Sequence, residues 1–170
     1  SSMENYATPN PHDLIVSWDV LEHIIDLPIA FNQMANALKT GGIAYHEYNP
    51  FFAINGGHSL CTLDFLFGHC VLGTKDFERY IRDFRPQEEK IDLNFYHKCL
   101  NRATRLDIKN LAEKHFEILE FDGRSSFGNQ SEDWKKDLEE KVLPIVQQNY
   151  PTATIADLMC DSVHIILRKK

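Results

Sequence analysis

The pattern of apolar and polar residues near the start of the chain predicts a buried strand that is followed at once by polar side chains. Residues 14–17 form a short run of apolar and small side chains, as expected of a parallel strand covered on both faces. Asp19, Glu22 and His23 come directly afterwards. Open α/β sheets bind ligands outside the carboxyl ends of their strands, so we expect a site here.

A helix is predicted next, because apolar side chains then recur at helical spacing. Asp26 can cap this helix and Pro28 suits its first turn. Gly41 and Gly42 are expected to end it, and residues 43–48 to form a second strand. This order favours a right-handed βαβ unit. The apolar positions of the helix are Leu27, Phe31, Met34 and Leu38.

The rest of the chain continues to alternate between helical and strand patterns. Residues 51–73 are rich in aromatic residues and glycine, and a connection of this length usually carries function or contains short elements. A capping-box pattern at Thr104 and Asp107 predicts a helix. Further strands are expected over residues 116–121 and 163–167, a helix from Ser131 that Pro144 bends or breaks, and a helix over 75–84 that buries Phe77, Tyr80, Ile81 and Phe84.

Composition limits the kinds of protein to consider. A chain of 170 residues with 43% hydrophobic residues suits one domain with a substantial core. The net charge of −7 is no footprint for nucleic acid or an anionic membrane, so neither is expected as a partner. With no membrane-length apolar run and no signal peptide, a cytoplasmic location is expected. Free, partly buried thiols are expected rather than disulfides at Cys61, Cys70, Cys99 and Cys160.

Residues 12–50, HDLIVSWDVLEHIIDLPIAFNQMANALKTGGIAYHEYNP, resemble class I S-adenosylmethionine-dependent methyltransferases. They look like that family's fourth strand, its acid-containing loop, the following helix, the Gly-Gly turn and the fifth strand. Residues 104–122 and 162–169 match its sixth and seventh strands in element order. The resemblance implies an α/β fold, a partial Rossmann-like sheet made of the last four strands, mixed in direction, with helices packed on it. Residues 51–103 would be an aromatic-rich helical insertion that covers the substrate side.

In this family a glycine-rich GxGxG loop follows the first strand, and an acidic residue stands at the end of the second strand. The sequence has neither feature. Those features hold the cofactor, so S-adenosylmethionine binding by this chain alone is expected to be weak or absent, and the isolated chain inactive. The strand edge at Leu14–Val16 would lie open. We expect a second copy of the chain, giving a dimer, or the N-terminal segment to cover it.

The resemblance also implies roles for the polar residues after the first strand. Ser17, Trp18 and Asp19 would lie beside the methionine and sulfonium part of the cofactor, with Glu22 and His23 close by. Some methyltransferases of this class bind a divalent metal through an acid-x-x-Glu-His segment and a later histidine. That histidine would be His46, His58 or His69 here. The alternative, which we adopt at this point, is that His23 hydrogen-bonds within its loop and no metal binds.

The acceptor side is expected in the insertion. His58 and His69 lie on either side of its aromatic segment and are candidate general bases, with His69 favoured for its tight surroundings, although both could be inert loop histidines. An apolar substrate pocket, or merely an anchor to the core, would be formed by Tyr48, Phe51, Phe52, Phe65 and Phe67.

Two classes of function remain open at this point. The first is methyl transfer from S-adenosylmethionine to an acceptor, with a small molecule favoured. The second is a non-catalytic methyltransferase-like module that acts by dimerisation or partner binding. A separate chain that supplies the glycine loop would restore the first function.

Overall fold

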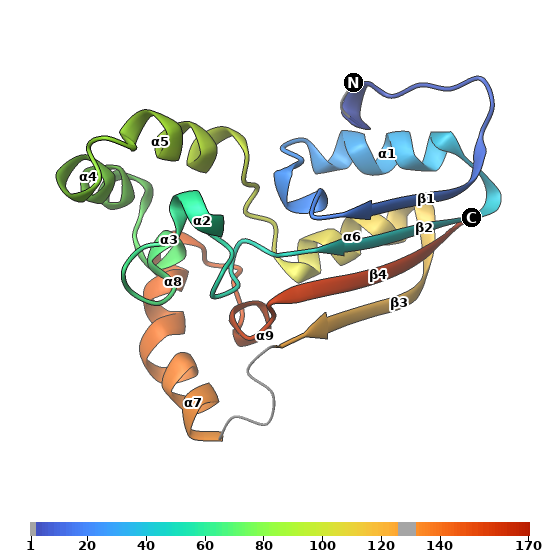
Figure 1. Ribbon diagram of the computed structural model, residues 1–170. Coiled ribbons are helices and arrows are strands. Elements are labelled where there is room, and N and C mark those ends of the chain that lie inside the picture. Colours follow the sequence, from blue (N-terminus) through green and yellow to red (C-terminus); the bar gives the residue numbers. More distant parts are fainter. Residues whose placement is uncertain (1–2, 126–131) are drawn as a thin grey trace.

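The computed structural model describes residues 3–125 and 132–170. Four strands form one sheet in the order β1-β2-β4-β3 (Figure 1). β1 runs parallel to β2, whereas the β2–β4 and β3–β4 pairs are antiparallel. The predicted α/β fold with a mixed four-stranded sheet is therefore confirmed. The strands are β1 (His12–Trp18), β2 (Leu38–Tyr48), β3 (Phe116–Arg124) and β4 (Ser162–Lys169).

Two helices, α1 (Leu27–Ala37) and α6 (Arg105–His115), pack together on the sheet (Figure 1). Both begin where the sequence predicted, because a side chain caps the free N–H groups of the first turn. Asp26 accepts a hydrogen bond from the N–H of Ile29 at 3.0 Å. Thr104 and Asp107 form a complete capping box. The core between sheet and helices includes all four of the predicted apolar positions: Leu27, Phe31, Met34 and Leu38.

The prediction that Gly41 and Gly42 end the first helix was wrong. α1 ends at Ala37, and β2 begins at the next residue, so both glycines lie within the strand. The pairing of β1 with β2 is irregular at this point, and Gly41 has a φ of +79°. Gly41 lies at a break in the strand register, and such a break uses the same left-handed backbone conformation as a helix end.

A second hydrophobic cluster lies among the helices of the insertion and of the chain after β3, beside the end of the sheet (Figure 1). The insertion is helical, as predicted, and folds together with helices from residues 132–158. This group consists of α2 (His58–Cys61), α3 (Gly68–Val71), α4 (Thr74–Phe84), α5 (Glu89–Lys98), α7 (Glu132–Asp137), a π-helical segment (Leu138–Val142), α8 (Leu143–Asn149) and α9 (Ile155–Leu158).

Several predicted details of these helices differ in the structure. α4 buries Phe77 and Ile81, but Phe84 is 70% exposed, because it lies in the last turn and its ring packs on Tyr80 at the surface. The helix changes before Pro144 rather than at it: the π-helical segment Leu138–Val142 follows α7, and Pro144 lies in the first turn of α8. The predicted start of this helix at Ser131 lies outside the described residues. No helix in the described parts of the chain is long and apolar enough to cross a membrane.

The first strand is open at its outer edge. The prediction that this strand is covered on both faces was wrong, because Leu14 and Val16 are both exposed on one face. The N-terminal segment therefore does not cover them, although one of our alternatives expected it to. Its 3₁₀ turn, Met3–Asn5, packs against α1 instead. Coverage by a second copy of the chain stays a prediction. All four cysteines are free, as expected, and three of them are buried.

Candidate functional site

The carboxyl ends of the two parallel strands are joined by the residues that directly follow each strand. Asp19 follows β1 and Asn49 follows β2, and the Nδ2 atom of Asn49 donates to Oδ1 of Asp19 at 2.7 Å. The N–H of Asp19 donates to the carbonyl of Glu47 at 2.9 Å. Asp19 adopts a left-handed φ of +53°, which is uncommon outside glycine and clusters at functional sites. These contacts bring the ends of both parallel strands together, and the site at this end of the sheet stays a prediction.

Glu22 belongs to a short 3₁₀ helix, Leu21–His23, that follows Asp19. Its side chain is only 2% exposed. The Oε1 atom accepts the N–H of Asn49 at 3.3 Å, but Oε2 is buried without a hydrogen-bond partner. Burial therefore raises the pKa of the Glu22 carboxyl group. A buried carboxylate oxygen without a donor is costly unless a cation or a ligand satisfies it.

The 3₁₀ helix is held in place by the segment that follows α5. The Nδ2 atom of Asn101 donates to the carbonyl groups of Leu21 and Ile24 at 2.6 and 2.9 Å. The Nδ1 atom of His23 lies 2.6 Å from the carbonyl oxygen of Cys99. A carbonyl can only accept, so Nδ1 carries a proton, and in the neutral ring the lone pair is therefore on Nε2. His23 thus hydrogen-bonds to a distant segment rather than within its own loop.

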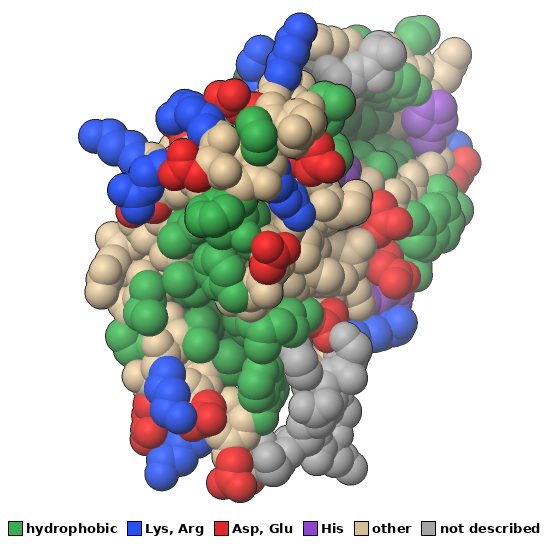
Figure 2. All heavy atoms as spheres, turned by 60° about the vertical axis from the view of Figure 1, so that its left-hand side comes forward, with side chains coloured by type: hydrophobic (Ala, Val, Ile, Leu, Met, Phe, Trp, Pro, Cys, Tyr) green, Lys and Arg blue, Asp and Glu red, His purple; other side chains and the backbone are tan. Residues whose placement is uncertain are grey.

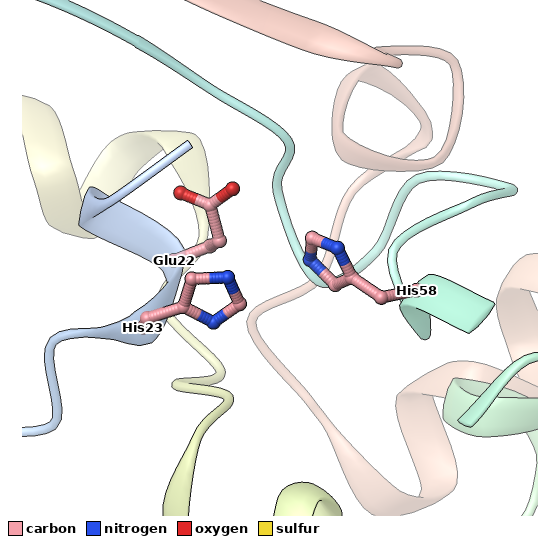
Figure 3. A group of neighbouring side chains, drawn as sticks. All are labelled: Glu22, His23 and His58. Carbon is pink, nitrogen blue, oxygen red and sulfur yellow. The ribbon is translucent and has the colours of Figure 1, made fainter. Parts of the chain in front are cut away.

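His58, at the start of α2, faces this cluster (Figure 3). Its ring centroid lies 5.0 Å from that of His23, and Phe95 packs against both rings. The Nε2 atom of His58 is buried without a partner, and burial lowers the pKa of the ring. Like Asp19, His58 has a left-handed φ, +50°. One ligand atom from each of Glu22, His23 and His58 lies within 4.8 Å of the other two.

Ser17 and Trp18 are adjacent in β1 and make their contacts on opposite faces of the sheet. The hydroxyl of Ser17 hydrogen-bonds Nδ1 of His46 at 2.7 Å, beside a small hollow of about 120 Å³ that Met3 also lines. Burial lowers the pKa of His46 to about 4. Trp18 is exposed and packs on Tyr45 with ring centroids 5.6 Å apart. The residues predicted to contact the cofactor are therefore distributed over both faces of the sheet at the end of β1, and they do not form one continuous surface.

His69, the base that the sequence favoured, lies in the interior. It is 1% exposed, and its Nε2 atom donates to the carbonyl of Phe51 at 2.7 Å. Burial lowers the pKa of His69 to about 4, so the ring is neutral at pH 7. An acceptor would reach this histidine only if the surrounding residues moved.

Most of the predicted substrate-pocket aromatics are enclosed by the two hydrophobic clusters. Tyr48 packs in the core of the sheet and α1, and Phe51, Phe52 and Phe67 pack in the helical cluster. Phe65 is exposed and borders a hollow of about 360 Å³. Phe51, Phe52 and Phe67 therefore anchor the insertion, Tyr48 belongs to the core of the sheet, and Phe65 is open to a ligand.

A larger hollow of about 660 Å³ lies between α2 and α5, and sequence reasoning missed it together with α5. Its lining includes Phe95, the residue that packs on His23 and His58. Hydrophobic side chains gather on this helical side of the molecule (Figure 2). The signal for α5 was its charge order, because acids begin the helix and basic residues end it. The lining residues are Leu60, Lys90, Ile91, Asn94 and Phe95.

Comparison with known proteins identifies the family. Residues 3–116 match the family described as "Methyltransferase domain". No curated protein sequence matches the chain. Among solved structures, the chain is similar to N-methyltransferase NodS from Bradyrhizobium japonicum WM9 (12% identity, TM-score 0.43) and to Haemonchus contortus phosphoethanolamine N-methyltransferase 2 with S-adenosyl-L-methionine (17%, 0.48). It is also similar to geranyl diphosphate C-methyltransferase from Streptomyces coelicolor A3(2) (14%, 0.44).

These alignments cover nearly all of this chain but only part of the other proteins. They include 99%, 99% and 100% of the chain, and 57%, 36% and 52% of the respective structures. The family match covers more than half of the 170 residues. The resemblance to class I S-adenosylmethionine-dependent methyltransferases is confirmed, and the chain belongs to the methyltransferase domain family.

Proposed function

We propose that this chain forms the acceptor side and part of the cofactor side of an S-adenosylmethionine-dependent methyltransferase. The observation that carries the proposal is the hydrogen bond between Asn49 and Asp19, which joins the carboxyl ends of the parallel strands β1 and β2. Ligands of open α/β sheets bind at such ends. In this proposal Ser17, Trp18 and Asp19 lie beside the methionine part of the cofactor.

The acceptor is proposed to be a small molecule that enters from the helical side. The hollow between α2 and α5 offers apolar walls at Leu60 and Ile91 and a cation at Lys90. The ring of Phe95 lines this hollow and also packs against the ring of His58. Methyl transfer is a displacement at a sulfonium carbon, in which orientation and proximity supply most of the acceleration. Of the two proposed bases, the position of His58 supports a proton-accepting role better than that of His69.

A calorimetric titration of the chain with S-adenosylmethionine tests the proposed division of the cofactor site. The sequence has no GxGxG loop, so we expect saturation only in the millimolar range, about −4 kcal/mol. Micromolar binding would contradict the inference that such a loop supplies most of the binding free energy for the cofactor. S-adenosylhomocysteine, which lacks the methyl group, serves as the matched ligand and should bind comparably.

A second candidate function, a non-catalytic module that acts by self-association, is favoured by the exposed first strand. Leu14, Val16 and Trp18 alternate along β1, all exposed on the same face. Apolar side chains on an open edge strand promote pairing with another chain. A stable dimer that shows no response to S-adenosylmethionine at any concentration would favour this function over methyl transfer.

A further inference from the structure

We propose that Glu22, His23 and His58 form a binding site for a divalent transition-metal ion, with Zn²⁺ the best match. The inference rests on the geometry of these three side chains and does not depend on methyl transfer. Their ligand atoms lie within 4.8 Å of one another, and the side chains converge from two separate segments of the chain (Figure 3).

Each of the three groups has an atom suited to a metal. The Oε2 atom of Glu22 and the Nε2 atom of His58 are both buried with no hydrogen-bond partner. The Nδ1 atom of His23 donates to the carbonyl of Cys99, so the neutral ring offers the lone pair of Nε2 to a metal. This arrangement, in which a backbone carbonyl fixes the tautomer of a ligating histidine, is the usual outer shell of a metal site.

The distances need only a small adjustment. Ligands at about 2.1 Å from a tetrahedral zinc ion lie about 3.4 Å apart, so the cluster would close by at most about 1.4 Å. Side-chain rotation can supply this movement for His58. Glu22 and His23 are held more firmly, since the segment around Asn101 fixes their short helix.

The chemistry of the ligands selects the class of ion. Two imidazoles and one carboxylate suit Zn²⁺ and similar transition metals better than Mg²⁺ or Ca²⁺, which prefer oxygen ligands. A cation would also satisfy the buried carboxylate oxygen of Glu22, which has 2% exposure. Asp19 adds a second negative charge close enough to act on both Glu22 and His58.

Three protein ligands leave one tetrahedral position for water or for an oxygen atom of a bound molecule. Phe95 packs on His23 and His58 and also lines the hollow beside α5, which would bring a molecule bound there close to the ion. The ion would use the same lone pair of His58 that a general base requires. Metal binding would therefore replace the proton-accepting role of His58, whereas the proposed cofactor side at Ser17–Asp19 would stay unchanged.

The test is a titration of the metal-free chain with Zn²⁺, and with Co²⁺ as a spectroscopic probe. We expect one saturable site, visible d–d absorption typical of tetrahedral Co²⁺, and shifts of the His23 and His58 ring signals in NMR spectra. Glu22→Gln keeps the acceptor for Asn49, and His58→Asn suits the left-handed backbone there. Each should weaken binding by about tenfold or more.

The matched control is His97→Asn, at an exposed histidine in α5 outside the cluster, which should leave the affinity unchanged. Circular dichroism of the metal-free variants checks that they fold. Absence of saturable binding, ring signals that shift only at other histidines, or an unchanged affinity in both Glu22→Gln and His58→Asn would overturn the proposal. None of these results would bear on S-adenosylmethionine binding, which the separate titration measures.

Discussion

The Nδ1 atom of His23 lies 2.6 Å from the carbonyl oxygen of Cys99, a contact between residues 76 positions apart in the sequence. It joins the loop after β1 to the end of α5. Two side-chain hydrogen bonds from Asn101 to the carbonyl groups of Leu21 and Ile24 strengthen the same connection. The site at the end of the sheet is therefore shaped by the helical part of the chain.

Asn101→Ala should destabilise this connection. The variant leaves the carbonyl groups of Leu21 and Ile24 without their side-chain donor, at an expected cost of about 2 kcal/mol in the free energy of unfolding. Urea unfolding followed by circular dichroism measures it. Asn36→Ala, at an exposed position of α1, should change stability by less than about 0.5 kcal/mol. Equal effects of the two substitutions would show that the connection contributes little.

Gly56→Ala should destabilise the turn that precedes His58 and α2. A Cβ atom at Gly56 would collide with the carbonyl oxygens of Phe51 and Pro50, and backbone atoms cannot give way as a flexible side chain can. We expect a loss of about 3 kcal/mol in the free energy of unfolding. Gly41→Ala is the comparison, because its Cβ would meet nothing within 4 Å. Only the positive φ should then lower the free energy of unfolding, by about 1 kcal/mol. A Gly56→Ala protein as stable as Gly41→Ala would contradict this account.

Much of the fold was predictable because its signals are local. The capping residues Asp26 and Thr104 act within a few positions. The apolar run of residues 14–17 marks a strand correctly, but not its burial, because covering its outer face depends on segments far away in the sequence. Gly41 misled the prediction, since a register break and a helix end need the same left-handed backbone.

The candidate site was only partly predictable because its members meet through tertiary contacts. Asp19 and Glu22 were found from their place after a strand. The choice of His58 over His46 and His69 as the neighbour of His23 depends on how the insertion folds back. Phe95 was missed altogether, because nothing in the local pattern of α5 indicates that one ring faces two histidines.

His69 should make the stability depend on pH. Burial holds its pKa at about 4 in the folded protein, against an ordinary value of 6.5. Between these values the unfolded chain binds a proton that the folded chain does not, so the free energy of unfolding falls as the pH drops. The expected loss is about 2 kcal/mol between pH 7 and pH 5.

Urea unfolding of the wild type and of His69→Gln at both pH values measures this contribution. Glutamine can still donate to the carbonyl of Phe51 but does not titrate, so its stability should fall less between the two pH values. An identical pH dependence of the two proteins would show that His69 is protonated in the folded state as readily as in the unfolded chain.

Val16→Lys should prevent self-association through the first strand. Val16 is exposed on β1, and a lysine on an edge strand opposes pairing with another chain by charge and by hydration. Light scattering coupled to size-exclusion chromatography should give a dimer for the wild type and a monomer for the variant. Ile29→Lys, at a similarly exposed position of α1, should remain dimeric. A monomeric wild type at high concentration would exclude the dimer.

The most direct measurement of the methyltransferase site uses the two tryptophans of the chain. Trp18 follows Ser17 at the end of β1, whereas Trp134 lies in α7. In ¹H–¹⁵N NMR spectra of the labelled chain, millimolar S-adenosylmethionine should shift the indole N–H signal of Trp18 and the amide signal of Asp19, and leave the Trp134 signal in place. Saturating S-adenosylmethionine that leaves Trp18 and Asp19 unshifted, or shifts Trp134 as strongly, would contradict a cofactor site at the end of the first strand.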